Sequence, residues 1–313
     1  IRNDGTLWAW GRNNAGQLGN GNTTNASAPV QIGVATDWLL CSAGGEHSVA
    51  LKKSGALYAW GDNTNGQLGL GDHTRRTAPA RVDGTAIFGD VSCGGQHTLA
   101  IRNNATLAAF GRNQDGQLGL GNGIDTHTPQ TVGAATDWIQ ISGGRLHSLG
   151  IRGNGTTNLL YAWGNNEWGQ LGDNTSTSRS VPTQENTAST NWSYSSAGGV
   201  LSLGIRANTA YQWGNNATKV PASYADAGNT NMVGVAAGYN RRLGSKSDGS
   251  LLTWGSNILG GYGSGEEPTV LTATAALVPP LPPVVTGQSI STTRRPTWTW
   301  TSGGNGGIGQ YRI

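Results

Sequence analysis

Residues 44–72 read GGEHSVALKKSGALYAWGDNTNGQLGLGD, and this stretch recurs with small changes along most of the chain. It contains a glycine-pair block, an apolar run that ends in tryptophan and glycine, and a polar loop that ends in GQLG. The tryptophan position recurs at intervals of about fifty residues, at Trp10, Trp60, Phe110, Trp163, Trp213 and Trp254. The first glycine of the block recurs at Gly44, Gly94, Gly144, Gly198 and Gly238. Recurrence at a period of this length predicts a repeat fold.

Each repeat is expected to form three or four short strands. Apolar runs such as LYAW and LAAF alternate between small and bulky residues, and successive side chains of a strand point to opposite faces. Both faces are apolar, so both require burial. With 51 glycines and only 12% charged residues, the composition disfavours helices. We therefore predict an all-β fold, a β-propeller of four-stranded blades, in which the bulky face of one blade packs on the small face of the next.

The polar loop is predicted to have a structural role. It follows the tryptophan strand in four of the six units, at residues 11–20, 61–70, 111–120 and 164–173. Its glycines allow a positive φ, and its asparagine can hydrogen-bond to nearby backbone.

The linked blocks of residues 44–72 resemble the repeat of the regulator of chromosome condensation family, and the resemblance covers about residues 1–277. It implies a β-propeller, which is seven-bladed in the best-known members. The chain has six tryptophan blocks and five glycine blocks, so we expect six blades or partial blades of a seven-bladed ring, with the missing part before Ile1.

Members of this family have different functions. The founding member is a guanine-nucleotide exchange factor for a small nuclear GTPase and binds chromatin, a plant relative senses ultraviolet light, and a secreted bacterial relative inhibits β-lactamases. The plant light sensor has a GWRHT block in its repeats, whereas the corresponding block of this chain reads GGEHS or GGQHT. No segment of the chain matches a GTPase-facing loop of the exchange factor. The resemblance implies protein binding through one rim of the ring.

The C-terminal residues depart from the repeat. Residues 278–293 form a proline-rich stretch that is expected to be a semi-rigid linker. Residues 294–313, with the run TWTWT, resemble the first strand and turn of a bacterial immunoglobulin-like domain. The alternative is a disordered tail.

Charge and cysteine content argue against several classes of function. The chain has a net charge of only +3 and contains no run of Lys or Arg, so we expect no nucleic-acid partner. No segment approaches the roughly 18 apolar residues of a membrane span. Cys41 and Cys93 occupy different positions in the repeat and belong to no CxxC motif, so we predict two buried free thiols, no metal site and no cofactor.

Catalytic and metal-binding patterns are weak. His47, His97 and His147 share one repeat position on different blades and are interpreted as hydrogen-bonded strand residues. Residues 62–66, DNTNG, begin like a calcium loop, but His73 stands where its glutamate is expected, which favours a turn. No repeated acidic position suggests a hydrolase pair, so we predict that the chain is not an enzyme.

Binding candidates are unusual residues at variable positions. Trp168 stands where the other loops have Ala15, Asn65 and Asp115, and could contact a sugar or a protein. The remaining candidates are His73, Arg75, Arg76, Arg241 and Arg242.

The sequence leaves three functions open. The first is a non-enzymatic extracellular or cell-surface module of a bacterial protein, which recognises a protein or glycan through rim loops and either adjoins immunoglobulin-like domains or self-assembles. The second is an intracellular exchange-factor-like regulator of a small GTPase. The third is a lectin or carbohydrate-active enzyme.

Overall fold

The computed structural model describes residues 1–82, 84–153, 156–215, 218–223, 229–239, 241–256, 269–275, 298–300 and 309–311. Every regular element in these ranges is a β-strand, so the prediction of an all-β fold is confirmed. No helix of the described residues is long and apolar enough to cross a membrane.

Five four-stranded antiparallel sheets form the blades, and their strands pair in chain order. The first comprises β3 (Trp38–Ala43), β4 (His47–Lys52), β5 (Leu57–Gly61) and β6 (Arg76–Arg81), and the second β7 (Phe88–Cys93), β8 (His97–Arg102), β9 (Leu107–Gly111) and β10 (Thr126–Thr131). The third comprises β11 (Trp138–Gly143), β12 (His147–Gly153), β13 (Asn158–Gly164) and β14 (Arg179–Gln184), and the fourth β15 (Trp192–Ala197), β16 (Leu201–Arg206), β17 (Thr209–Gly214) and β18 (Thr218–Ser223). The fifth comprises β19 (Met232–Ala237), β20 (Arg241–Lys246), β21 (Leu251–Ser256) and β22 (Thr269–Ala275).

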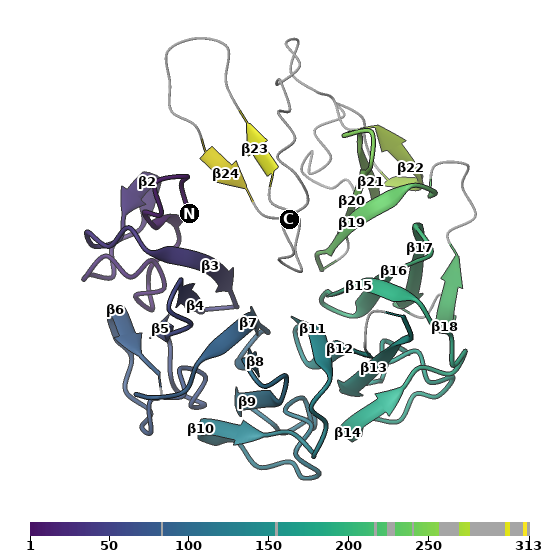
Figure 1. Cartoon of the computed structure of the whole chain (residues 1–313), viewed down its shortest axis with the longest axis horizontal. Helices are drawn as coiled ribbons and strands as arrows, with labels where there is room; N and C mark the ends of the chain where they lie inside the picture. The colour runs from purple at the N-terminus through teal and green to yellow at the C-terminus, as the bar shows by residue number, and fades with distance from the viewer. Residues whose placement is uncertain are drawn as a thin grey trace.

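Figure 1 shows that the sheets are arranged around a common centre. The first strand of each blade, β3, β7, β11, β15 or β19, is innermost, and the last strand is outermost. A sixth sheet has only two strands, β1 (Trp8–Gly11) and β2 (Ala26–Gln31), which correspond to the two outer strands of a blade.

The blades pack through the alternation that the sequence shows. In the first interface, Leu57 and Ala59 of β5 share a buried cluster with Phe88 and Phe110 of the next blade. Leu107 and Ala109 pack in the same way with Trp138 and Trp163. A small face and a bulky face thus pack together as predicted, because both faces of each sheet lose contact with water. The chain order is the reverse of the prediction, since the small face of one blade meets the bulky face of the following one.

Tryptophan at the repeated position is buried wherever a preceding loop covers it. Trp163 is 0% exposed, and its Nε1 donates to the Gln117 carbonyl of the previous loop at 2.9 Å. Trp10, in β1, is 48% exposed. The equivalent residues differ in this respect: Trp60, Trp163 and Trp213 each donate to a glutamine carbonyl of the loop one repeat earlier, and Trp10 stands in β1, ahead of the first of these loops.

The polar loop has the structural role that the sequence predicts. Asn63 Oδ1 accepts from the Leu68 N–H at 3.0 Å, and its Nδ2 donates to the Asp72 carbonyl at 2.9 Å. Gly66 adopts a φ of +80°, which suits glycine. The Gln67 carbonyl then accepts from Thr98 Oγ1 of the next blade at 2.8 Å, so the loop also joins two blades.

The predicted linker at residues 278–293 lies outside the described residues. Within 294–313 the structure describes β23 (Trp298–Trp300) and β24 (Gly309–Tyr311), which pair antiparallel. The start of an immunoglobulin-like domain stays a prediction.

Candidate functional site

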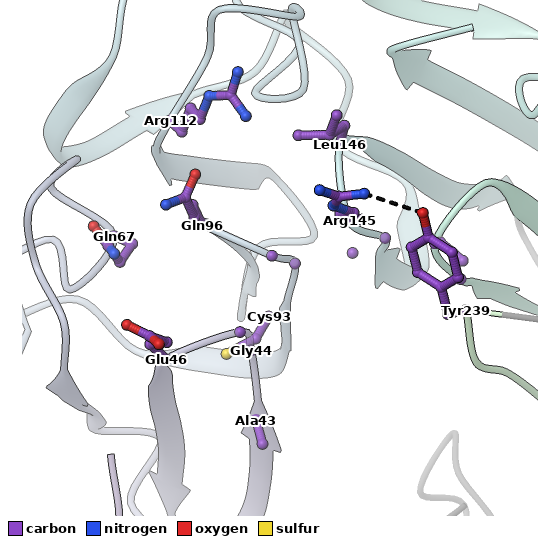
Figure 2. A pocket seen from close by; sticks show the side chains of 18 of the residues that line it. Ala43, Gly44, Glu46, Gln67, Cys93, Gln96, Arg112, Arg145, Leu146 and Tyr239 are labelled. Atoms are coloured by element: carbon purple, nitrogen blue, oxygen red, sulfur yellow. Dashed lines mark hydrogen bonds between the residues drawn. The ribbon is translucent and has the colours of Figure 1, made fainter. Parts of the chain in front are cut away.

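A cavity of about 710 Å³ opens at the centre of the ring. Its walls come from the turns between the first and second strands of all five complete blades, together with Asp62, Gln67 and Arg112 from the loops that follow β5 and β9. Because paired strands alternate in direction, both kinds of connection lie on the same side of the ring. We call this side the mouth face and the opening the central cavity; Figure 2 shows its lining.

Glycine forms the rim of the central cavity. A Cβ on Gly94 would lie 2.6 Å from the Gly144 carbonyl oxygen and would also meet the His97 ring. The turns can therefore approach one another only without side chains at this position. Backbone hydrogen bonds follow the rim from blade to blade: Gly45 N–H to Gly95 O (3.1 Å), Gly95 N–H to Gly144 O (3.0 Å), Arg145 N–H to Gly198 O (3.0 Å) and Gly199 N–H to Gly238 O (3.2 Å).

Serine hydroxyls add a second set of bonds between blades. Each accepts a backbone N–H from the last residue of the next blade's first strand: Cys93 to Ser42 (3.0 Å), Gly143 to Ser92 (3.0 Å), Ala197 to Ser142 (2.9 Å) and Ala237 to Ser196 (2.9 Å). The rim of the cavity is therefore a hydrogen-bonded frame, which holds the side chains that project from it.

The second residue of the turn differs among the five turns. It is glycine at Gly45, Gly95 and Gly199, but arginine at Arg145 and tyrosine at Tyr239. Arg145 Nη1 lies 3.3 Å from Tyr239 Oη, and its guanidinium carbon lies 5.7 Å from the centre of the Tyr239 ring. Neither residue was predicted as a site residue, although both stand out in the aligned glycine blocks as departures from glycine.

Other charged groups of the cavity have partners. Glu46 forms an ion pair with Arg12 at 3.0 Å, and Arg112 forms one with Asp115 at 3.2 Å. Asp62 Oδ2 accepts from Gln67 Nε2 at 2.7 Å and from Thr64 Oγ1 at 2.8 Å. These last contacts agree with the interpretation of residues 62–66 as a turn.

The three repeated histidines are buried hydrogen-bonding residues, as predicted. Their Nε2 atoms contact hydroxyls of the next blade: His47 to Thr98 (3.0 Å), His97 to Ser148 (2.9 Å) and His147 to Ser202 (2.9 Å). Burial lowers their pKa values to about 4 for His47 and about 3 for the other two. They are therefore neutral. The described residues contain no group of three or more His, Cys, Asp or Glu side chains that could hold a metal ion.

Both cysteine thiols are free. Cys93 is buried, and burial raises its pKa to about 12. Cys41 is half-buried, so the prediction that both cysteines are buried is wrong for Cys41. Its side chain packs against the hydrophobic cluster that contains Trp38 and Trp60.

The predicted binding residues lie on or beside the mouth face, but the structure does not gather them. His73 is exposed and contacts His127 of the next blade, with 5.2 Å between ring centres. Arg75 donates to the Asn14 carbonyl at 3.2 Å, and Arg76 pairs with Asp72 at 2.6 Å.

Arg241 and Arg242 begin β20, in the fifth blade. Arg242 pairs with Trp254 across the strands, where the equivalent positions of the other complete blades have Ser48, Thr98, Ser148 and Ser202. Arg241 is exposed and Arg242 is half-buried.

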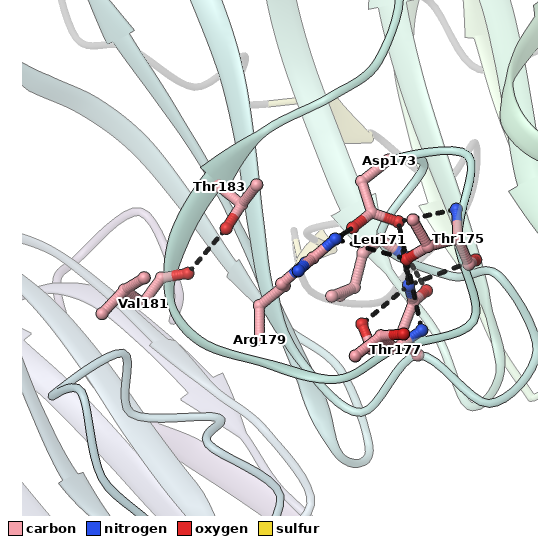
Figure 3. A network of polar contacts seen from close by, with 8 residues as sticks. Leu171, Asp173, Thr175, Thr177, Arg179, Val181 and Thr183 are labelled. Atoms are coloured by element: carbon pink, nitrogen blue, oxygen red, sulfur yellow. Dashed lines mark hydrogen bonds and ion pairs between the residues drawn. The ribbon is translucent and has the colours of Figure 1, made fainter.

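Trp168 is 37% exposed on the loop after β13. Figure 3 shows the contacts that hold this loop, among them the 2.7 Å ion pair of Arg179 with Asp173. Burial raises the pKa of Asp173, but hydrogen bonds from Thr175 and Arg179 outweigh it, so the pKa lies below its usual value. Trp168 is thus presented on an ordered polar loop.

Comparisons with known proteins support the interpretation of the repeats. The model of the regulator of chromosome condensation (RCC1) repeat matches residues 4–51, 54–101, 107–151 and 158–205. A second model of the same description matches residues 90–117 and 138–170. Protein RCC2 homolog of Danio rerio is 41% identical over 56 residues, which are 17% of this chain and 11% of that protein. The matched part therefore spans about a tenth of that relative.

Solved structures show the same fold at low identity. Human WBSCR16 has a TM-score of 0.77 at 23% identity, over 87% of this chain and 76% of that one. Prp20p of Saccharomyces cerevisiae, described with its binding to Gsp1p and histones, has a TM-score of 0.68 at 20% identity, over 80% of this chain and 66% of that one. Yeast RCC1 (Prp20) bound by Kap60 has the same TM-score at 19% identity, over 80% of this chain and 64% of that one.

The prediction of an extracellular or cell-surface location is wrong. The chain is similar to a Protein RCC2 homolog, and Prp20p, which has the same fold, is described with its binding to Gsp1p and to histones, which are proteins of the cell interior. The abundant asparagine serves loops within the blades, where residues such as Asn63 hydrogen-bond to nearby backbone. The comparisons also give no support for an adhesion role or a bacterial surface protein.

The described blades, the repeated glycine turns and the match of the repeat model over more than half of the chain agree, and the chain belongs to the RCC1 repeat family.

Proposed function

We propose that the chain is a regulator of a small GTPase, similar to a guanine-nucleotide exchange factor, and that it binds its protein partner through the mouth face. The observation that carries the proposal is the central cavity, which opens on this face and presents Arg145 and Tyr239 at its rim. Support also comes from the family, whose founding member acts on a small nuclear GTPase, and from Prp20p, which is described with its binding to Gsp1p.

The rigidity of the ring suits this function. An exchange factor shifts its partner toward the nucleotide-free state by binding that state more tightly than the nucleotide-bound one. A surface that is already ordered loses little conformational entropy on binding. The hydrogen bonds that the Gly95 N–H donates to the Gly144 carbonyl and the Gly143 N–H donates to the Ser92 hydroxyl hold the mouth face in one arrangement before a partner arrives.

We propose further that the chain acts by binding, without covalent catalysis and without a cofactor. The charged groups Glu46, Asp62 and Arg112 are engaged in ion pairs or hydrogen bonds that stabilise the loops. The repeated histidines are buried and neutral, which suits a role in joining blades.

The test is a nucleotide-release assay with the full chain. Small GTPases of the source organism are loaded with fluorescent GDP, and release is followed in excess unlabelled GTP. We expect at least one GTPase to release its nucleotide about tenfold faster or more, which corresponds to about 1.4 kcal/mol. Tyr239→Ala, on the mouth face, is expected to reduce this effect. Lys53→Ala, in the turn between β4 and β5 on the opposite side of the ring, is the matched control.

Two results would contradict the proposal. The first is that no GTPase of the panel responds, although chelation of Mg²⁺ by EDTA releases the nucleotide from each of them. The second is that Lys53→Ala reduces the effect while Tyr239→Ala does not, which would place binding on the other face.

A further inference from the structure

Two turns of the central cavity depart from glycine at the same position, and their side chains meet. Arg145 belongs to the third blade and Tyr239 to the fifth, so their contact passes over the turn of the fourth blade. That turn has Gly199, where a Cβ would lie 2.5 Å from Tyr239 Cδ2. The absence of a side chain at Gly199 is therefore what lets Tyr239 lie across the fourth turn and reach Arg145.

Tyr239 holds the guanidinium of Arg145 in place without neutralising it. The hydroxyl contact is 3.3 Å, and the ring lies within the range of a cation–π interaction. Arg145 is exposed and Tyr239 is 55% exposed, so both remain accessible from the cavity. An exposed tyrosine that carries no charge is a suitable support for an arginine that must bind an anion, because the planar donor fork stays available.

Arg145 differs from the other charged residues around the cavity. Arg112 and Glu46 have ion-pair partners, whereas no ion pair to Arg145 occurs within the described residues. Figure 2 shows the Arg145 side chain at the rim beside Tyr239, away from Glu46. The rim therefore has one positive group that lacks a carboxylate partner in this part of the structure.

The chemistry of the cavity favours a protein over a nucleic acid as its occupant. Arg112, the other arginine that lines the cavity, is engaged in an ion pair with Asp115, so Arg145 is the arginine of the described lining that is left to contact an anion. Nucleic-acid binding needs several clustered cations, and the net charge of the chain is only +3. A volume of about 710 Å³ lies in the range of ligand pockets, roughly 300–1,000 Å³, and can accept the tip of a loop.

We propose that the central cavity receives an acidic loop of the protein partner, with Arg145 as the residue that contacts its carboxylate and Tyr239 as a positioning residue. This inference rests on the proposed function, which assigns protein binding to the mouth face. The new element is that the segment of the partner that enters the cavity is acidic.

The experiment measures binding of a short probe, so it does not depend on a GTPase. A fluorescein-labelled peptide of glycine and serine with three consecutive glutamates is titrated with the full chain at low salt, and fluorescence anisotropy is recorded. The same peptide with three glutamines tests the need for charge. We expect Arg145→Ala to weaken binding of the glutamate peptide at least about tenfold, since hydrogen bonds to ionised groups are among the stronger ones.

Two further variants separate a local role from a general effect of charge. Arg81→Ala removes one exposed positive charge from the outer strand β6 and is expected to leave binding within about twofold. Tyr239→Phe keeps the ring and removes the hydroxyl, and it is expected to weaken binding less than Arg145→Ala does. Thermal unfolding of each variant shows whether the fold is kept.

Several results would overturn the inference. Equal losses in Arg145→Ala and Arg81→Ala would show non-specific attraction. Equal binding of the glutamine peptide would exclude a carboxylate contact, and Arg145-dependent binding of a DNA duplex without binding of the peptide would favour a nucleic acid. If GTPase exchange is observed but the acidic peptide does not bind, the proposed function stands and this inference fails; binding of the peptide without exchange gives the reverse.

Discussion

His97 lies 2.9 Å from the hydroxyl of Ser148, and this contact joins the second blade to the third. The same hydroxyl donates its proton to the Gln117 carbonyl at 2.8 Å, so the histidine is the donor and carries its proton on Nε2. Its Nδ1 atom is buried without a hydrogen-bond partner among the described residues. A neutral histidine with one defined tautomer thus connects a strand, the following blade and a loop.

Replacement of His97 by glutamine is expected to destabilise the protein by about 1–3 kcal/mol, because the Ser148 hydroxyl loses its donor inside a buried site. Urea unfolding measures the change. His73→Gln, at an exposed histidine of the outer rim, is expected to alter stability by less than about 0.5 kcal/mol. Equal effects of the two substitutions would argue against a role for the contact between blades.

Acid is expected to destabilise the protein through the three buried histidines. Burial lowers their pKa values to about 4, 3 and 3, whereas the unfolded chain keeps the ordinary value near 6.5. Below that value the unfolded state binds protons that the folded state excludes, so the free energy of unfolding falls as the pH falls from 6.5 towards 3–4. Each histidine contributes a loss of roughly 1 kcal/mol between pH 7 and pH 5.5.

Urea midpoints at pH 7 and pH 5.5 check this dependence. The variant His97→Gln lacks one of the three groups and should lose about a third of the difference. A stability that is independent of pH in this range would contradict the assignment of neutral histidines.

Gly94→Ala is expected to destabilise the ring by about 1–3 kcal/mol. The added Cβ would lie 2.6 Å from the Gly144 carbonyl oxygen and would also meet the His97 ring, so the two turns must separate. Gly89→Ala is a matched control in β7, since a Cβ added there would have no described atom within 4 Å beyond its own chain neighbours. Differential scanning calorimetry of both variants should show a lowered Tm for Gly94→Ala alone.

Trp163→Ala is expected to cost about 3–5 kcal/mol, because the ring is fully buried and its Nε1 donates to the Gln117 carbonyl. Trp10→Ala, at the equivalent position in β1, should cost less than half of that, since Trp10 is 48% exposed. Urea unfolding of the two variants checks the ratio. A cost for Trp10→Ala as large as that for Trp163→Ala would show that Trp10 is covered in solution.

The candidate site could be predicted from the sequence only in part. The glycine turns were found from their recurrence, but the prediction of binding residues missed Arg145 and Tyr239. It chose Trp168, His73, Arg75, Arg76, Arg241 and Arg242. The departure of these two from the second glycine was present in the aligned blocks. Its meaning depends on the turn between them, where Gly199 leaves room for the contact.

The sequence alone determined the period, the strands and the two faces of each blade, because alternation of small and bulky side chains is a local property of an extended chain. It also determined that the histidines and the polar loops serve the fold, since they recur with the blades. Only the tertiary structure decided which residues of different blades meet. His97 reaches Ser148, and Arg145 reaches Tyr239 over the turn of the fourth blade, because the arrangement of the blades around one centre brings together turns that are far apart in the chain.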